Sequence, residues 1–265
     1  MLDPYNRHIT YLRISVTDRC NLRCMYCMPK GQVTFMPREH LLSPDEIAEV
    51  VKVAARLGIK KIRLTGGEPL VRHDIVEIVR RIRAIEGITE ICLTTNGTRL
   101  AQLAFKLKEA GLSRVNISLD TLNPEKFTMI TRGRLTNVLD GIEAALAAQL
   151  TPVKINFVRI KGVNETDEEE VKKFCAQKNL QVRFIRQMNL RTGEFYPVEG
   201  GDGGNCQICN RLRLTARGDI KPCLFGSSGF NIRELGIEQA FMMAIRHKPA
   251  KGEINDSHSF YNIGG

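Results

Sequence analysis

The sequence YLRISVTDRCNLRCMYC, residues 11–27, predicts a β-strand that leads directly into three cysteines. β-Branched and apolar residues mark the strand at its start. Cys20, Cys24 and Cys27 follow, with three and then two residues between them. Because α/β enzymes build their active sites at the ends of strands, this spacing collects three thiolates where chemistry is expected.

Beyond this stretch, short apolar runs alternate with amphipathic helical stretches as far as Arg186. The alternation is typical of repeated βα units on a parallel sheet. About six such units are too few to close an eight-stranded barrel. We therefore expect an α/β fold, an open and partial TIM-type barrel of about six βα units. The expected strands are 11–16, 61–65, 90–94, 114–119, 153–160 and 181–186.

The pattern changes after Met188. The glycine-rich stretch 192–205 shows no periodicity and predicts an extended loop, and a helix is expected over 232–246. We expect two regions: a partial barrel over 1–188, and a C-terminal region over 189–265 that carries a second cysteine group and a tail.

Composition narrows the classes of function. Apolar residues make up 43% and charged residues 26%, as in ordinary globular proteins. No apolar run approaches the roughly 20 residues of a membrane span, and residues 1–13 lack the apolar stretch of a secretory signal. We expect a cytoplasmic protein without a membrane partner.

The charge and aromatic content indicate the class of ligand. The net charge of +10 is spread along the chain, and aromatic residues are only 6%, with no tryptophan. These features favour an anionic small molecule over nucleic acid as the ligand.

The first cysteine group favours an iron-sulfur cluster. A structural zinc site needs four protein ligands, and the nearest further candidate is the distant His40. Three thiolates on a four-iron cluster leave one iron open, as the reductive cleavage of a sulfonium requires. At the end of the next strand, two glycines of the loop 65–69, TGGEP, let the backbone approach a ligand closely. Zinc or redox thiols for the cysteines, and a plain turn for the glycines, are the alternatives.

Three more cysteines, Cys206, Cys209 and Cys223, form the second group, whereas Cys92 and Cys175 stand alone and are expected to be packing residues. The second group is either a zinc site completed from elsewhere or a second cluster with an open iron. Arginines follow it closely in the segment 210–215, NRLRLT, where they could fork toward an anion.

The two motifs CNLRCMYC and TGGEP resemble those of the radical S-adenosylmethionine superfamily. Nearly the whole chain is similar to the GTP 3′,8-cyclase family of molybdenum cofactor biosynthesis, on residues 12–21, LRISVTDRCN, on residues 209–215, CNRLRLT, and on the terminal IGG of 263–265. The resemblance implies a radical lyase with two 4Fe-4S clusters and S-adenosylmethionine.

In that family, the first cluster generates a 5′-deoxyadenosyl radical that abstracts the ribose 3′ hydrogen of GTP. The carbon radical attacks C8 of guanine, and the product is (8S)-3′,8-cyclo-7,8-dihydroguanosine 5′-triphosphate. The resemblance also implies a reducing electron donor of the flavodoxin or ferredoxin type, and a homodimer.

The resemblance assigns roles residue by residue. It implies cluster ligation by Cys20, Cys24 and Cys27 and, at the second cluster, by Cys206, Cys209 and Cys223. Contacts to S-adenosylmethionine fall on Tyr26, Gly67, Glu68, Ser118 and Met188. Contacts to GTP fall on Arg13, Arg63, Thr94, Lys154, Arg211, Leu212 and Arg213. Catalytic roles fall on Arg211, Arg213 and the tail residues Gly264 and Gly265, which in the family insert into the active site.

The chain departs from the family pattern between Met188 and Cys206, where relatives carry a substantially longer segment. Arg186 and Gln187 stand where an acidic residue is usual before that methionine, and Phe260 stands where methionine is usual. A shortened wall leaves two alternatives open. One is a radical enzyme with an auxiliary cluster that modifies a peptide or another metabolite, and the other is a zinc-stabilised basic binding module without catalysis.

Metal analysis separates the cluster hypothesis from the zinc module. Protein purified anaerobically is expected to be coloured and to contain iron and sulfide, because both cysteine groups lack the fourth ligand of a zinc site. Stoichiometric zinc without iron would reject the enzyme hypothesis.

Overall fold

The structure is a computed structural model that describes residues 1–28, 33–255 and Ile263. Its described residues form a nine-stranded sheet in the order β6-β5-β4-β3-β2-β1-β7-β8-β9. The strands are β1 Tyr11–Ser15, β2 Lys61–Thr65, β3 Glu90–Thr95, β4 Arg114–Ser118, β5 Lys154–Arg159, β6 Gln181–Arg186, β7 Arg211–Leu214, β8 Asp219–Lys221 and β9 Phe230–Asn231. Strands β1 to β6 pair in parallel throughout, which confirms the expected fold class.

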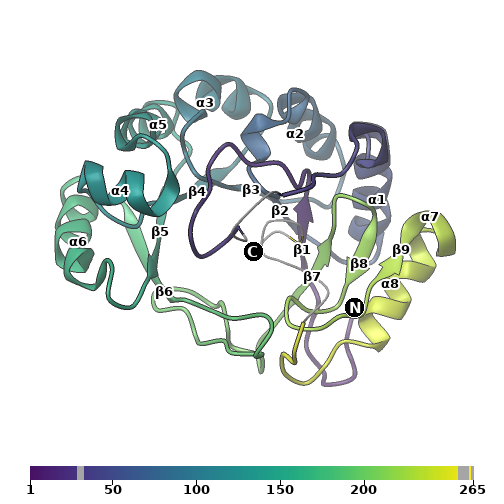
Figure 1. Cartoon of the computed structure of the whole chain (residues 1–265). Helices are drawn as coiled ribbons and strands as arrows, with labels where there is room; N and C mark the ends of the chain where they lie inside the picture. The colour runs from purple at the N-terminus through teal and green to yellow at the C-terminus, as the bar shows by residue number, and fades with distance from the viewer. Residues whose placement is uncertain (29–32, 256–262, 264–265) are drawn as a thin grey trace.

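Helices cover the convex face of the sheet and form the outer ring in Figure 1. The α-helices are α1 Pro44–Arg56, α2 Ile75–Arg83, α3 Leu100–Glu109, α4 Pro124–Thr131, α5 Leu135–Ala147, α6 Glu168–Gln177, α7 Ile232–Leu235 and α8 Ile237–Arg246. Short 3-10 turns lie at η1 Arg38–His40, η2 Pro69–Val71 and η3 Glu165–Asp167. α1 begins with a complete capping box, in which the side chains of Ser43 and Glu46 each accept a hydrogen bond from the backbone N–H of the other. The single helix expected over 232–246 is instead two, because Gly236 adopts a positive φ of 78° between them.

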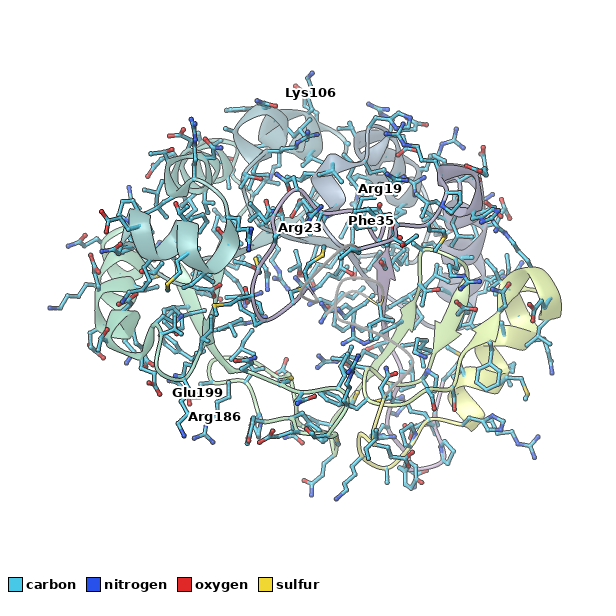
Figure 2. All side chains as sticks on the ribbon, in the orientation of Figure 1. Arg19, Arg23, Phe35, Lys106, Arg186 and Glu199 are labelled. Atoms are coloured by element: carbon cyan, nitrogen blue, oxygen red, sulfur yellow. The ribbon has the colours of Figure 1, made fainter. Side chains whose placement is uncertain are left out.

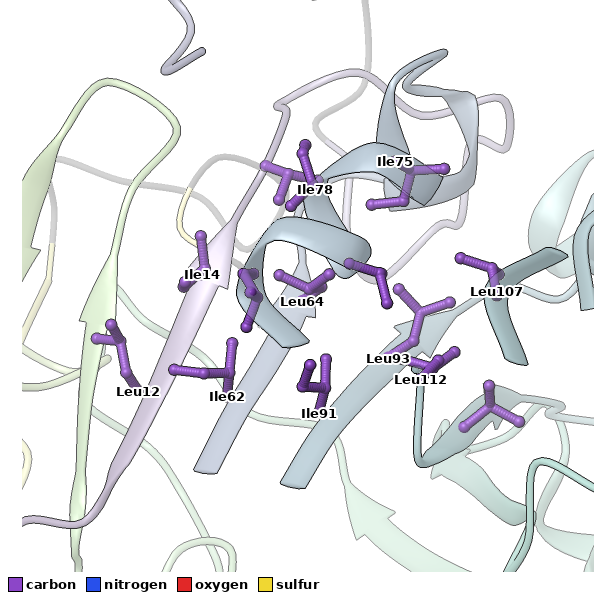
Figure 3. Close-up of a cluster of buried hydrophobic side chains, with 14 of the residues drawn as sticks. Leu12, Ile14, Ile62, Leu64, Ile75, Ile78, Ile91, Leu93, Leu107 and Leu112 are labelled. Carbon is purple, nitrogen blue, oxygen red and sulfur yellow. The ribbon is translucent and has the colours of Figure 1, made fainter. Parts of the chain in front are cut away.

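Alternating side chains give the sheet two different faces. In β1 and β2, Leu12 and Ile14 lie in register with Ile62 and Leu64, and all four are fully buried. They pack with residues of α2 and α3 such as those in Figure 3, forming the core between sheet and helices. Each such side chain contributes about 1.5–3 kcal/mol by leaving water.

Polar residues occupy the opposite, concave face. One row of register partners runs across five strands and contains four arginines: Arg213, Arg13, Arg63, Cys92 and Arg114. Because neighbouring side chains on a strand point to opposite faces, the apolar partners on either side of this row cannot reach the concave face. The interior of the partial barrel is therefore strongly cationic.

The C-terminal region continues the same sheet. β7 pairs in parallel with β1, and β8 and β9 follow in antiparallel order. The sequence pattern missed these three strands, since four, three and two residues are too short to show a period. The proposed boundary at Met188 stays a prediction.

The barrel does not close by strand pairing: β6 is an edge strand, and a connection without helices runs from it to β7 in Figure 1. The connection between them makes only isolated β-bridges, Phe184 with Glu199 and Asn189 with Glu194. The expected extended loop over 192–205 therefore forms the wall of the barrel on this side. No helix in the described part of the chain is long and apolar enough to cross a membrane.

The carboxylate of Glu90 lies among cations at the start of β3, and its charge is expected to stabilise the fold. Lys61 Nζ lies 2.6 Å from it, and Arg114 and Cys92 also donate hydrogen bonds to it. Partial burial alone would raise the pKa of Glu90, but the hydrogen bonds from Lys61, Cys92 and Arg114 lower it from 4.5 to about 2. A carboxylate with a lowered pKa contributes stability above its unfolded pKa and loses it as the pH falls toward the folded value.

We predict that Glu90→Gln lowers the free energy of unfolding by about 1–2 kcal/mol at pH 6, and that the deficit shrinks as the pH falls below 4.5. Urea unfolding at a series of pH values between 6 and 3.5 measures this. The control is Glu169→Gln, because Glu169 is 72% exposed in its pair with Lys172 and such pairs contribute little. A deficit that does not change with pH would contradict the prediction.

Candidate active site

All six clustered cysteines face one cavity of about 340 Å³ at the carboxyl ends of the parallel strands. Cys20, Cys24 and Cys27 lie on one side of it, in the loop after β1. The second group approaches from the segment before β7 and the turn after β8. The volume lies in the range of small-molecule sites, so both groups can act on one ligand.

Hydrogen bonds within the loop hold the first cysteine group in place. The backbone N–H groups of Cys27 and Met28 both donate to the carbonyl oxygen of Cys24 at 3.0 Å, and the N–H of Leu22 donates to the sulfur of Cys20 at 3.4 Å. Burial raises the pKa of all three thiols, to about 12 for Cys27. Such thiols stay protonated in the absence of a metal, and a bound cation is what makes them thiolates.

Glycine is required in the loop after β2 because the cysteine loop lies directly against it. The N–H of Gly67 donates to the carbonyl oxygen of Thr17 at 2.8 Å, and the N–H of Glu68 donates to that of Arg19 at 2.7 Å. A Cβ on Gly67 would lie 2.3 Å from the carbonyl oxygen of Arg19. Neither backbone segment can approach this closely if a side chain is present.

Glu68 is the one acidic side chain that lines the cavity among the described residues. Its carboxylate accepts hydrogen bonds from Thr95 Oγ1 and the N–H of Asn96, both at 2.6 Å, and from the N–H of Leu70 at 3.0 Å. Burial raises the pKa of Glu68 to about 7 despite these donors. The carboxylate joins the ends of β2 and β3, and Asn96 in turn reaches Cys20 Sγ at 3.9 Å.

Tyr26 is held between the first cysteine group and β4. Its hydroxyl group donates to Asp120 Oδ2 at 2.8 Å, and Asp120 Oδ1 accepts from the N–H of Val158 at 2.8 Å. Burial raises the pKa of Asp120 to about 6. This chain of bonds fixes the aromatic ring beside Cys24 and Cys27.

The second cysteine group is surrounded by cations. Burial alone would raise the pKa of Cys209, but the charge of Lys248 and the N–H of Arg211 outweigh burial and lower it. Burial raises the pKa of Cys223. Arg7 donates to the carbonyl oxygen of Cys206 at 2.7 Å.

Arginines give the cavity its affinity for anions. Arg13, Arg211 and Arg213 line it together. Burial and the neighbouring Arg211 lower the pKa of Arg213 to about 10. Several cations facing a cavity with only one carboxylate in its described lining favour a multiply charged anion.

Most of the predicted site residues meet at this cavity. It is lined by Arg13, Cys20, Cys24, Tyr26, Cys27, Gly67, Glu68, Thr94, Ser118, Met188, Cys206, Cys209, Arg211, Arg213 and Cys223. Arg63 does not line it, although its Nη1 donates to Thr94 Oγ1 at 3.0 Å, and Lys154 also lies deeper in the barrel. Gly264 and Gly265 lie outside the described residues.

Leu212 differs from the other predicted contacts to GTP, because its side chain points away from the cavity. Its side chain is fully buried in the core between the sheet and the helices. The reason is alternation: β7 turns Arg211 and Arg213 toward the cavity, so the residue between them must point the other way. Only the backbone of Leu212 can face a ligand.

Sequence reasoning missed Asn96, Arg183 and Lys248. Arg183 lies in register with Asn156, which lines the cavity. Burial and the nearby charge of Arg63 lower the pKa of Arg183. Arg183 therefore belongs to the concave face. The alternation of polar and apolar residues in 181–186 could have identified it. Nothing in the sequence indicates that Lys248, far along the chain, lies against Cys209.

Among the described residues, no group of three or more His, Cys, Asp or Glu side chains is placed to hold a metal ion. Each cysteine group offers three thiolates, which is the donor set of a four-iron cluster with one open iron. The cavity, the three cysteines on each side of it and their N–H donors fit such clusters.

Comparison with known proteins gives concordant results. The family model of the radical SAM superfamily matches residues 14–175. The chain is 40% identical to the GTP 3′,8-cyclase of Petrotoga mobilis, over 98% of this chain and 95% of that protein. It is 42% identical to the GTP 3′,8-cyclase of Moorella thermoacetica, over 97% and 96%. The alignment with the Petrotoga protein is 314 positions long, so that relative has residues that this chain of 265 lacks.

Solved structures share the fold at low identity. The structure of anSMEcpe with bound AdoMet superposes with a TM-score of 0.66 at 16% identity, covering 91% of this chain and 79% of that one. Streptococcus suis SuiB gives a TM-score of 0.61 at 15% identity, covering 93% and 68%. At such identities the likeness shows the fold alone.

The close approach of the two loops predicts the effect of a single methyl group. Gly67→Ala must displace the backbone at Asp18 and Arg19 and with it Cys20, so we expect most iron at the first site to be lost. The measurement is iron per chain after anaerobic reconstitution, in a background without Cys206, Cys209 and Cys223.

The matched control for this substitution is Gly229→Ala. A Cβ there would meet its nearest neighbour at an ordinary 3.4 Å, so iron content should stay at the level of the background. Full loading of the Gly67→Ala variant would contradict the steric argument.

Proposed function

The chain belongs to the radical S-adenosylmethionine superfamily and, within it, to the GTP 3′,8-cyclase family, and from this premise we propose that it cyclises GTP to (8S)-3′,8-cyclo-7,8-dihydroguanosine 5′-triphosphate in molybdenum cofactor biosynthesis. The observation that carries the proposal is the shared cavity, which both cysteine groups line together with Arg13, Arg211 and Arg213. Each feature has a part in the proposed reaction.

The first cysteine group is proposed to hold the cluster next to S-adenosylmethionine. When bound, that cluster supplies the electron for reductive cleavage of the sulfonium. The chain's own residues are proposed to hold the cofactor. Gly67 has no side chain, so its backbone can approach the cofactor closely. Asp120 fixes Tyr26 through a hydrogen bond, and Ser118 and Met188 also line the cavity. Glu68 mainly joins the ends of two strands. Its Oε2 accepts one hydrogen bond, from the N–H of Asn96, and can accept another.

The second cysteine group is proposed to hold an auxiliary 4Fe-4S cluster that meets the guanine base. Support comes from the donor set of Cys206, Cys209 and Cys223, with the N–H of Arg211 on one sulfur and no fourth ligand among the described neighbours. An iron left without a protein ligand offers a site for a base nitrogen or oxygen.

The triphosphate is proposed to bind the concave arginine row. Arg13, Arg211 and Arg213 reach the cavity directly, and Arg63 supports Thr94 from behind. Arginine forks fit phosphate oxygens in pairs. Lys154 and Arg183, deeper in the barrel, add positive potential and do not need direct contact.

The tail is proposed to complete the site. Ile263 is 1% exposed and packs with Leu190 and Phe225, next to Met188 and Cys223. The burial of Ile263 beside these residues supports the catalytic role expected for Gly264 and Gly265, which themselves lie outside the described residues.

The proposal extends to the cell compartment, the electron donor and the oligomeric state. Eight free cysteines suit the reducing cytoplasm, and the electron is proposed to come from a donor of the flavodoxin or ferredoxin type. We also propose a homodimer, in which a second copy could cover the open side between β6 and β7. Residues 1–188 and 189–265 are proposed as the barrel and the auxiliary-cluster region.

A second candidate is a peptide or another metabolite as substrate, favoured by the same side of the barrel, where residues 187–205 connect β6 to β7 without a helix. The arginine row argues against it, because a peptide has no need of a triphosphate clamp.

An anaerobic assay with dithionite, S-adenosylmethionine and GTP tests the proposal. We expect 5′-deoxyadenosine and the cyclised nucleotide to form together, measured by mass spectrometry. Formation of 5′-deoxyadenosine with no cyclised product would reject GTP and leave the radical reaction standing.

Substitution of one cavity arginine should separate the two products. Arg211→Ala is expected to lower cyclised product by about 100-fold or more and to leave part of the S-adenosylmethionine cleavage, because Arg211 lies beside the second cysteine group. Lys106→Ala is the control, since Lys106 lies on the outside of α3 in Figure 2. Equal loss of both products in Arg211→Ala would argue against a role confined to the substrate.

A further inference from the structure

A buried lysine without an assigned role lies against the second cysteine group. Lys248 follows α8 and is only 3% exposed. Its ammonium group donates to Cys209 Sγ at 3.4 Å and to the carbonyl oxygens of Arg211 and Pro222 at 2.9 and 2.8 Å. An ammonium group has three donors, so each of them has a fixed acceptor.

The charge of this lysine requires a negative partner. Among the described residues no carboxylate forms an ion pair with Lys248, and its two carbonyl contacts provide only dipoles. Buried charges in proteins are paired or lie beside metal centres. A metal-bound thiolate at Cys209 would place a negative charge 3.4 Å from the ammonium group.

Other buried cations nearby contact the backbone. Arg7 is paired with Asp3 and donates to the carbonyl oxygen of Cys206. Lys221 is 1% exposed and donates to the carbonyl oxygens of Ser227 and Ser228. Within the described part of the chain, Lys248 is the lysine that donates to a cysteine sulfur.

We propose that Lys248 raises the reduction potential of the second 4Fe-4S cluster through its hydrogen bond to Cys209. This rests on the proposed function, because it requires a cluster at Cys206, Cys209 and Cys223. Reduction adds negative charge to a cluster, and a donor to a ligand sulfur stabilises that charge. Lys248 is a positioning residue in this scheme, since it acts through Cys209 and touches no substrate.

The contacts of Lys248 also join two parts of the site. Arg211 and Cys209 belong to the segment entering β7, and Pro222 precedes Cys223 after β8. One side chain thus fixes the separation of two proposed ligands. Any test must distinguish this structural effect from the effect of charge.

The test uses the full chain with Cys20, Cys24 and Cys27 replaced by alanine, reconstituted anaerobically so that only the second cluster can form. Iron per chain is measured first, and the midpoint potential is then followed by electron paramagnetic resonance. Lys248→Met is expected to lower the potential by at least 59 mV, which is a tenfold change in the equilibrium of a one-electron couple. Lys248→Arg keeps the charge and should recover most of the shift.

Lys221→Met is the matched control, because it removes an equally buried ammonium group that contacts no sulfur. It should shift the potential clearly less than Lys248→Met does. Equal shifts in the two variants, or an unchanged potential in a fully loaded Lys248→Met, would overturn the role of Lys248 and leave the second cluster intact. No recovery in Lys248→Arg at full iron content would also overturn it.

Two outcomes concern loading itself. If the parent chain binds no iron at this site, the second cluster is rejected together with the role of Lys248. If the parent and Lys248→Arg load and Lys248→Met does not, Lys248 is needed to hold the cluster, and its proposed role in setting the potential is overturned in favour of a structural one.

Discussion

The structure depends on the two-residue alternation of side chains in a parallel sheet. On each strand from β1 to β6, one set of residues must pack against helices, which leaves the other set for the concave face. The chain fills the first set with isoleucine, leucine and valine, and fills much of the second with arginine and lysine. A cationic interior could not fold without this division, because the same charges placed toward the helices would have no water and few partners. The same alternation therefore produces both the hydrophobic core and the lining of the cavity.

A second constraint acts where the strands end. The loops after β1 and β2 lie so close together that their backbones bond directly, Gly67 to Thr17 and Glu68 to Arg19. Cys20 comes immediately after this contact. Its position is therefore set by the sheet, through main-chain bonds, more than by the conformation of its own loop. The guanidinium groups of Arg19 and Arg23 lie 5.8 and 5.6 Å from the centre of the Phe35 ring, and Figure 2 labels all three residues.

Much of this could be predicted from the sequence, for identifiable reasons. The six strands of the barrel carry strong apolar patterns and are separated by capped helices, and cysteine spacing alone identifies the two cysteine groups that line the cavity. The short strands β7 to β9 escaped prediction because four, three and two residues show no usable period. Leu212 was assigned to the substrate through its neighbours, although alternation within β7 assigns it to the core. Lys248 could not be found, because its partner Cys209 is 39 residues away in the chain.

The gap between β6 and β7 has an evolutionary consequence. Since β7 takes its hydrogen bonds from β1, the sheet places no demand on how long the connection from β6 must be. Residues can be gained or lost there for little more than the entropy of a loop, about 0.6 kcal/mol for each doubling of its length. The first cysteine group follows β1 and Cys223 follows β8, outside this connection, whereas Cys206 and Cys209 lie at its end, next to β7. The family can therefore remodel one side of its reaction chamber, changing which molecules fit, without rebuilding the radical machinery that faces it.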